Sequence, residues 1–309
     1  MSEPRLRLHP DAASRPAEAG PTRRSGETGA GVTRLVVSAP AKVNLFLHVT
    51  GRRADGYHTL ESLFVLIDWA DTLTLESRDD GTIVRAQPLP GVDDRDDLAM
   101  RAAHALRNAT GITRGVTIAV DKRIPIGAGL GGGSADAASI LLALNRLWHL
   151  GLTRSALAEI GGHLGADVPF FVGGEAALAR GIGELLTPVS MPTLWLALVV
   201  PQVHVSTAEI FAAPNLTRAA PSAKIDVFSE GYGRNDLESV ASAKFPGVAS
   251  AIAVLKRASP SARMTGSGGG AFATFASEAD AHAALVGVPR EFATRVARTL
   301  PRHPLAAFA

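Results

Sequence analysis

The stretch Pro125-Ile126-Gly127-Ala128-Gly129-Leu130-Gly131-Gly132-Gly133-Ser134-Ala135-Asp136-Ala137 carries five glycines within seven positions. Glycine has no Cβ, so the backbone of such a loop can approach a ligand closely and can adopt positive φ where a concave turn needs it. A run of helix formers follows as far as Trp148, with Ala137, Leu141 and Leu144 on the same face as Trp148 at helical spacing. The loop therefore opens a helix whose free N–H groups and positive dipole end face the glycines. A phosphate is the expected occupant.

Two better-known phosphate loops do not fit this stretch. The pattern Gly127-x-Gly129-x-x-Gly132 formally matches the dinucleotide fingerprint, but residues 121–125 separate the glycines from the preceding strand, and the first carboxylate after Asp136 is Glu159. A Walker A loop ends in Gly-Lys-Ser/Thr, and no lysine stands before Ser134. Any lysine for the phosphates must come from elsewhere in the chain. A glycine-rich surface loop without a ligand is the alternative.

The composition indicates a soluble globular protein, because 46% of the 309 residues are apolar. No apolar run approaches the roughly 18 residues of a membrane span, so no membrane association is expected. The 31 basic and 29 acidic residues leave a net charge of +2, which gives no sign of a nucleic-acid surface. The sequence has no cysteine, which excludes disulfides and thiolate chemistry and suits a reducing cytoplasm.

The first half of the chain reads mainly as strands. Residues 1–33 are rich in Pro, Ala, Ser, Thr, Gly and Arg and are predicted to be disordered. Strands are predicted over residues 39–51, 59–67, 72–77, 82–86 and 116–120, with a hairpin turn at Asp55-Gly56 and a helix over residues 97–108. Strands precede and outnumber helices, which favours an α+β fold.

Asp167 stands in an unusual place. Thr153 is predicted to cap a helix that ends at Gly165, and an apolar segment begins at Val168, so that this carboxylate lies between a helix end and a buried stretch. A surface acid in a turn is the alternative reading.

The second half of the chain begins near residue 191. A strand is predicted over residues 194–200, helices over 207–211 and 249–257, a helix capped by Ser277, and a closing strand over 292–298. Between them a second glycine loop, residues 266–270, leads into a strand. We interpret this loop as backbone that approaches the same ligand from the other side.

Three separated stretches resemble the signature motifs of the GHMP small-molecule kinases: residues 40–45 (Pro-Ala-Lys-Val-Asn-Leu), 125–137 and 264–270 (Met-Thr-Gly-Ser-Gly-Gly-Gly). Residues 51–60 and 164–171 further resemble the members of this family whose alcohol substrate carries a cytidine diphosphate. The resemblance runs from about residue 36 to the C-terminus. It implies an α+β fold of two domains with mixed or antiparallel sheets: an ATP-binding domain over residues 34–190, a second domain over residues 191–309, and an active site in the cleft between them.

The resemblance also implies a reaction, the ATP-dependent phosphorylation of a tertiary 2-hydroxyl group in the synthesis of isoprenoid precursors. Asp167 matches the family's base, and Lys42 matches the lysine near that base and the γ-phosphate. Ser134 matches a serine near Mg²⁺, the expected cofactor; no carboxylate ligand of the ion is identified. Asp136 is expected to stabilise the helix N-terminus rather than to bind metal. Asp97-Leu98 stand where the family often has Asn-Leu, which leaves recognition of the adenine base open.

The ligand contacts that the resemblance implies fall into two sets. The nucleotide would lie against Pro125, Ile126, Gly127, Ala128, Gly129, Leu130, Gly131, Gly132, Gly133, Ser134 and Ala135. The cytidine-bearing substrate would lie against Asn44, Tyr57, His58, Phe211, Gly266 and Ser267. Within the second set, Tyr57 and Phe211 would sandwich the pyrimidine and His58 would hydrogen-bond its edge, unless all three are ordinary packing residues.

Two other functions remain open. A GHMP kinase of the mevalonate or homoserine type would share Lys42, Asp167 and both loops but would have no use for a cytidine clamp. A nucleotide-binding regulatory protein without turnover is the second, and the presence of both Lys42 and Asp167 counts against it. The expected partner in every case is a small molecule, neither a nucleic acid nor a membrane.

Overall fold

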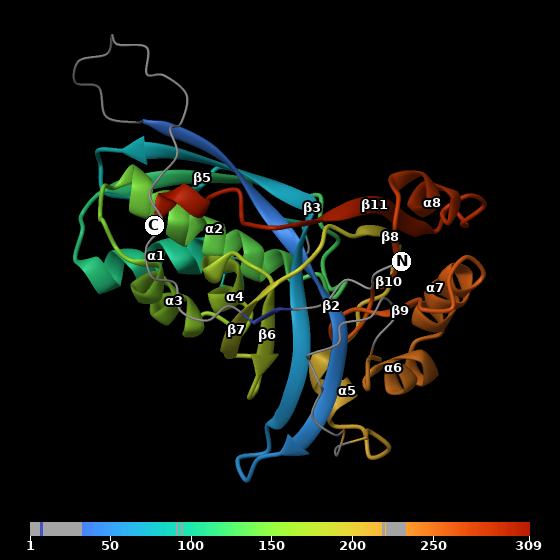
Figure 1. Cartoon of the computed structure of the whole chain (residues 1–309). Coiled ribbons are helices and arrows are strands. Elements are labelled where there is room, and N and C mark those ends of the chain that lie inside the picture. The colour runs from blue at the N-terminus through green and yellow to red at the C-terminus, as the bar shows by residue number, and fades with distance from the viewer. Residues whose placement is uncertain (1–6, 9–32, 91, 94, 218–219, 221–232) are drawn as a thin grey trace.

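The structure is a computed structural model, and it describes residues 7–8, 33–90, 92–93, 95–217, 220 and 233–309. Within these residues the fold is an extended mixed sheet flanked by helices, as the α+β prediction requires (Figure 1). The segment predicted to be disordered, residues 1–33, lies outside the described residues except for residue 33 and the short strand β1 (Arg7–Leu8), which pairs with β7 (Leu185–Ser190). In the described ranges no helix is long and apolar enough to cross a membrane.

Two long antiparallel strands, β2 (Arg34–Arg52) and β3 (His58–Arg78), run through the whole molecule (Figure 1). They turn at the predicted hairpin, which extends beyond the rest of the sheet. The prediction of two separate strands over residues 59–67 and 72–77 is wrong, because β3 is continuous. Asp71 interrupts the apolar pattern, but its buried carboxylate accepts hydrogen bonds from the backbone N–H groups of Arg123 and Ile124, so the strand passes through it.

Strand β3 is the hub of the sheet. It pairs with β2, β5 (Gly115–Asp121), β6 (Ala177–Arg180) and β11 (Phe292–Leu300). The strand order is β1-β7-β6-β3-β11-β8-β10-β9, with β8 (Trp195–Pro201), β9 (Arg263–Met264) and β10 (Ala271–Phe275) in the second half. The parallel pair of β4 (Ile83–Arg85) with β5 makes the sheet mixed. Strands β4, β5, β8 and β11 confirm the predicted positions to within two residues, whereas β6 and β7 were not predicted.

Four helices gather on the first half of the sheet: α1 (Leu98–Thr110), α2 (Gly132–Leu147), α3 (Arg154–Gly162) and α4 (Val168–Gly173). The predicted helix starts are confirmed, since Asp97 accepts from the backbone of α1 and Thr153 accepts from Ala156 N. Helix α3 ends at Gly162 rather than Gly165, because a turn in which Gly165 N donates to Gly161 O closes it. Helix α2 is buried almost throughout and forms the centre of the core beneath the glycine loop.

The second half holds α5 (Thr207–Phe211), α6 (Glu238–Lys244), α7 (Pro246–Lys256) and α8 (Glu278–Ala283) against β8 and β10. Helix α5 and the Ser277 cap of α8 agree with the prediction, α7 begins three residues early, and α6 was not predicted. The chain then returns to the first half through β11 and the 3-10 turn η1 (Ala306–Phe308), where Asn145 and Arg154 donate to the carbonyls of Phe308 and Ala306. One continuous sheet therefore links the two halves, and the domain boundary near residues 190 and 191 stays a prediction.

Candidate active site

The first glycine loop leads directly into α2, as predicted. Gly127, Gly129 and Gly131 have φ of +75°, +73° and +70°, a region that residues with a Cβ rarely adopt, and Gly131 is the N-cap of the helix. A cavity of about 500 Å³ lies over the loop. Every residue from Pro125 to Ser134 lines it, whereas Ala135 is buried and does not. The cavity therefore has the size of a small-molecule site and a floor of backbone at a helix N-terminus.

The second glycine loop packs against the first through backbone contacts. Gly270 N donates to Ala128 O over 2.8 Å. A Cβ on Gly266 would lie 2.7 Å from Gly129 O, and one on Gly269 would lie 2.6 Å from Gly127 O. These glycines are therefore required for the contact between the loops, a reason that the sequence did not reveal. Of the two predicted ligand residues in this loop, Ser267 lines the cavity, and its Oγ lies 2.6 Å from Thr207 Oγ1 at the start of α5.

Lys42 and Asp167 meet beside the first loop. Lys42 Nζ lies 3.5 Å from Asp167 Oδ2, and the backbone N–H of Lys42 donates to Leu130 O over 2.9 Å. The Lys42 side chain is only 6% exposed, whereas that of Asp167 is 32% exposed. Asp167 occupies the N-cap position of α4 without capping the helix, so its carboxylate is turned toward the lysine and remains open to solvent. The two residues predicted to act together are thus in contact.

Asn44 completes this pair on the buried side. Its Oδ1 accepts from Lys42 Nζ over 2.5 Å, and its Nδ2 donates to Ser62 Oγ over 2.8 Å. Its backbone N–H donates to Thr265 Oγ1, which belongs to the third motif. Asn44 is 2% exposed, so the direct substrate contact expected of it stays a prediction, and its visible contacts are with Lys42 and the strands.

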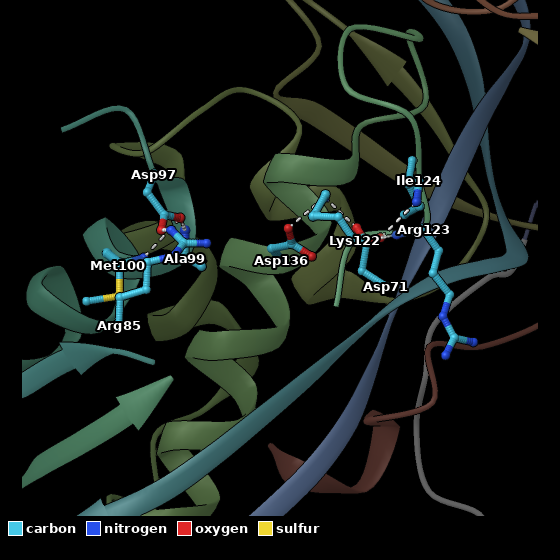
Figure 2. A network of polar contacts seen from close by, with 9 residues as sticks. All are labelled: Asp71, Arg85, Asp97, Ala99, Met100, Lys122, Arg123, Ile124 and Asp136. Atoms are coloured by element: carbon cyan, nitrogen blue, oxygen red, sulfur yellow. Dashed lines mark hydrogen bonds and ion pairs between the residues drawn. The ribbon is translucent and has the colours of Figure 1, made fainter. Parts of the chain in front are cut away.

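A second lysine, which the sequence analysis overlooked, lies under the loop. Lys122 Nζ lies 2.5 Å from Asp71 Oδ2 and 2.8 Å from Asp136 Oδ2 (Figure 2). Lys122 and Asp136 both line the cavity, and a Cβ on Gly132 would lie 3.2 Å from the ammonium nitrogen. Asp136 was expected to stabilise the helix N-terminus, but its carboxylate is paired with Lys122 instead. The available signal was the position of Lys122, which stands three residues before Pro125 at the start of the loop.

The two carboxylates share one ammonium group, and burial in this cluster shifts the pKa values of Asp136 and Lys122. Burial raises the pKa of Asp136 to about 7, against the lowering effect of Lys122. Burial alone would lower the pKa of Lys122, but the charges of Asp136 and Asp71 raise it. Oδ1 of Asp136 has no hydrogen-bond partner among the described residues. The cluster therefore contains two carboxyl groups, Asp71 and Asp136, and one ammonium group, Lys122.

The far end of the cavity is formed by the start of α1. Asp97 and Leu98 line it. Asp97 caps the helix by accepting from Ala99 N over 3.0 Å, and its other oxygen is paired with Arg85 (Figure 2). The carboxylate is therefore engaged by a cation and by the helix at the position where the family often has asparagine.

The residues predicted to bind a pyrimidine lie near one another on the hairpin and on α5. The rings of His58 and Phe211 stack with centroids 5.2 Å apart and an interplanar angle of 27°. Tyr57 is 63% exposed, and its backbone N–H donates to Asp55 Oδ1 at the hairpin turn. Phe211 is the last residue of α5, whose first residue Thr207 contacts Ser267. The structure thus links these aromatic residues to the edge of the cavity, and their role stays a prediction.

Comparison with known proteins gives consistent results. Family models match the chain as GHMP kinases N terminal domain over residues 97–175 and as GHMP kinases C terminal over residues 219–294. A 4-diphosphocytidyl-2-C-methyl-D-erythritol kinase of Cupriavidus necator is 55% identical over 276 residues, 88% of this chain and 94% of that protein. The protein of the same name from Thiobacillus denitrificans is 54% identical over 267 residues, 86% of this chain and 96% of that protein. A crystal structure of 4-(cytidine 5'-diphospho)-2C-methyl-D-erythritol kinase matches with a TM-score of 0.77 at 33% identity and covers 86% of this chain and 99% of its own.

Proposed function

The chain belongs to the GHMP kinase family, and we propose that it is a 4-diphosphocytidyl-2-C-methyl-D-erythritol kinase, which transfers the γ-phosphoryl group of ATP to the 2-hydroxyl of its substrate in the non-mevalonate (MEP) pathway to isoprenoid precursors. The observation that carries the chemistry is the contact between Lys42 and Asp167 beside the glycine loop, where the backbone of Lys42 donates to Leu130 O. A base and a cation beside a phosphate cradle are what phosphoryl transfer to an alcohol requires.

Asp167 is the proposed base. A tertiary alcohol is hindered and weakly acidic, so a carboxylate held close to it assists as its oxygen attacks the γ-phosphorus. The new bond forms between the hydroxyl oxygen and phosphorus, the bond to the β,γ-bridging oxygen breaks, Asp167 takes the proton, and ADP leaves. Its partly exposed position suits this role, because a substrate can reach the carboxylate from solvent.

Lys42 is proposed to stabilise the transferring group. Its ammonium lies next to the base and to the loop, where negative charge develops on the phosphoryl oxygens. Its buried stem is packed against the loop, since a Cβ on Gly131 would lie 3.1 Å from Lys42 Cγ. The position of the charge is therefore fixed before ATP arrives.

The loop between Pro125 and Ser134 is proposed to bind the nucleotide phosphates through backbone N–H groups at the start of α2. Ser134 offers a hydroxyl oxygen at the same place, which suits Mg²⁺ because this ion is held by few protein oxygens together with phosphates. When bound, the ion neutralises charge on the phosphates.

The cytidine of the substrate is proposed to bind between Tyr57 and Phe211, with His58 reading its edge. The stacked pair of His58 and Phe211 supports an aromatic site at this position, and Tyr57 is exposed enough to close over a base. Ser267, which contacts Thr207 at the start of α5, and its neighbour Gly266 are proposed to bind the rest of this substrate. The sequence without cysteine favours a reducing compartment, and we propose that the reaction takes place in the cytoplasm.

An assay of ADP release tests the proposal. The purified chain is given ATP and Mg²⁺ with the cytidylylated methylerythritol, free methylerythritol, mevalonate or homoserine in separate reactions. We expect turnover with the first compound alone. Turnover with mevalonate or homoserine would instead identify another kinase of the family, and ATP binding without turnover on any alcohol would indicate a regulatory protein.

A further inference from the structure

The hydrogen bonds around Asn44 form a directed chain that ends on Lys42. Ser62, near the start of β3, is fully buried, and its hydroxyl donates to Phe46 O over 2.6 Å. The pairing of β2 with β3 shifts register between Asn44 and Leu47, which brings this carbonyl within reach of the serine. The hydroxyl proton of Ser62 is therefore used in a hydrogen bond to the backbone.

The hydrogen bond from Ser62 to Phe46 O determines the orientation of the Asn44 amide. With its proton on Phe46 O, Ser62 Oγ can only accept from Asn44, so it faces the amide nitrogen at 2.8 Å. The amide oxygen then points the other way, to Lys42 Nζ at 2.5 Å. A lysine ammonium can only donate, so the opposite orientation would set two donors against each other. Each member of the chain thus determines the orientation of the next.

We propose that Ser62 is a positioning residue for phosphoryl transfer, and that it acts through Asn44 to hold Lys42 against Asp167. The inference rests on the proposed function. Ser62 itself touches neither ligand nor cavity, because it is fully buried and its backbone is paired with β2 on one side and β6 on the other. Among the hydrogen bonds of the described residues, the one from Asn44 connects Ser62 to Lys42.

Loss of the hydroxyl frees the amide to rotate. The buried nitrogen of Asn44 would then have no acceptor at position 62, and the amide could shift from the place where its oxygen accepts from Lys42. Lys42 would lose its fixed place 3.5 Å from Asp167. Since small misplacements of a charge at a reacting centre can cost up to about 10²-fold in rate, we expect kcat to fall roughly 10- to 100-fold. Neither Ser62 nor Asn44 is among the residues that line the cavity, so we expect both KM values to stay within about twofold of the wild type.

The test compares Ser62→Thr with Ser62→Val, two variants of the same shape that differ by one hydroxyl group, and adds Ser62→Ala. Ser139→Ala is the matched control, because Ser139 is also fully buried and its Oγ lies 3.4 Å from His303 Nε2, away from the cavity. For each variant kcat, both KM values and the thermal unfolding midpoint are measured, with the wild type in the same assay. We expect the threonine variant to keep the wild-type kcat, the valine and alanine variants to lose it with KM unchanged, and the control to lose stability only.

The possible failures are separable. If the wild type does not turn over, the proposed function fails rather than the positioning role. If the wild type is active and the valine variant equals the threonine variant in kcat, the role of Ser62 is disproved while the kinase stands. A loss of kcat in the control as large as in Ser62→Ala would also overturn the inference, because it would trace the effect to general destabilisation.

Discussion

The carboxylate of Asp136 lies 2.8 Å from the ammonium of Lys122, which already holds Asp71 at 2.5 Å. Because burial raises the pKa of Asp136 to about 7, the folded protein keeps a proton there that the unfolded chain, with a carboxyl pKa of about 3.9, releases. Between about pH 4 and pH 7 the folded state therefore binds more protons, and the contribution of this group to stability falls as the pH rises.

Asp136→Asn should remove this pH dependence. We expect the variant to gain stability relative to the wild type on going from pH 5 to pH 8, as measured by the urea midpoint at both values. Asp121→Asn is the control, since Asp121 is an exposed acid paired with Arg123 in the same region. Parallel pH profiles for wild type and Asp136→Asn would contradict the titration described here.

Asp167→Asn should abolish most of the activity without disturbing the fold. The amide keeps the shape of the side chain but cannot accept the hydroxyl proton, so kcat should fall by roughly 10²–10⁴. ATP affinity, measured by calorimetry, should stay near that of the wild type. Asp79→Asn, at an exposed acid, is the control and should keep the wild-type kcat. A wild-type kcat in Asp167→Asn would exclude Asp167 as the base.

Tyr57→Ala should weaken the cytidine substrate selectively. Stacking of a base on an aromatic ring is worth about 1–3 kcal/mol, so the KM of this substrate should rise by roughly one to two decades while the KM of ATP hardly changes. Stability should be unaffected, because the residue is 63% exposed. Leu185→Ala, at another exposed apolar residue, should change neither KM. An equal rise in the KM of ATP would argue against a cytidine site at the hairpin.

Gly269→Ala should damage the contact between the two glycine loops. The new Cβ would lie 2.6 Å from Gly127 O, and φ is +89°. Gly287→Ala is the matched control, since φ there is +75° but nothing lies within 4 Å. Both variants place a Cβ on a residue with positive φ, so they share the backbone strain. A larger loss of ATP affinity in Gly269→Ala therefore measures the effect of the clash with Gly127 O. Equal effects would mean that the contact does not shape the nucleotide site.

Local chemistry made much of the fold predictable. Thr153 and Ser277 were identified as helix caps because the relevant hydrogen bonds are made within three residues. The loop and α2 were predicted because glycine content and helical spacing lie in one stretch. The break predicted between residues 67 and 72 was wrong, since the buried carboxylate of Asp71 is acceptable within a strand when donors that lie far away in the sequence reach it.

The same limit applies to the site. Lys42 and Asp167 came from a family resemblance, and their contact is confirmed by the geometry. The cluster of Asp71, Lys122 and Asp136 was not predicted, because each member is an ordinary charged residue in its own segment. The pairing of β3 with β5 brings Asp71 close to Lys122, and the packing of α2 brings Asp136 to the same ammonium group.

The backbone contact between Gly270 and Ala128 also bears on how the protein matures. During synthesis the first glycine loop leaves the ribosome long before the second. Strand β3 can pair with β11, the last strand, only when the chain is nearly complete. The nucleotide cradle is consequently among the latest parts of the native state to form, because contacts distant in sequence close last. Nascent chains that stop before residue 270 should bind no ATP. In the complete protein a bound nucleotide should contact both halves. It should therefore lower the rate of proteolysis in both halves.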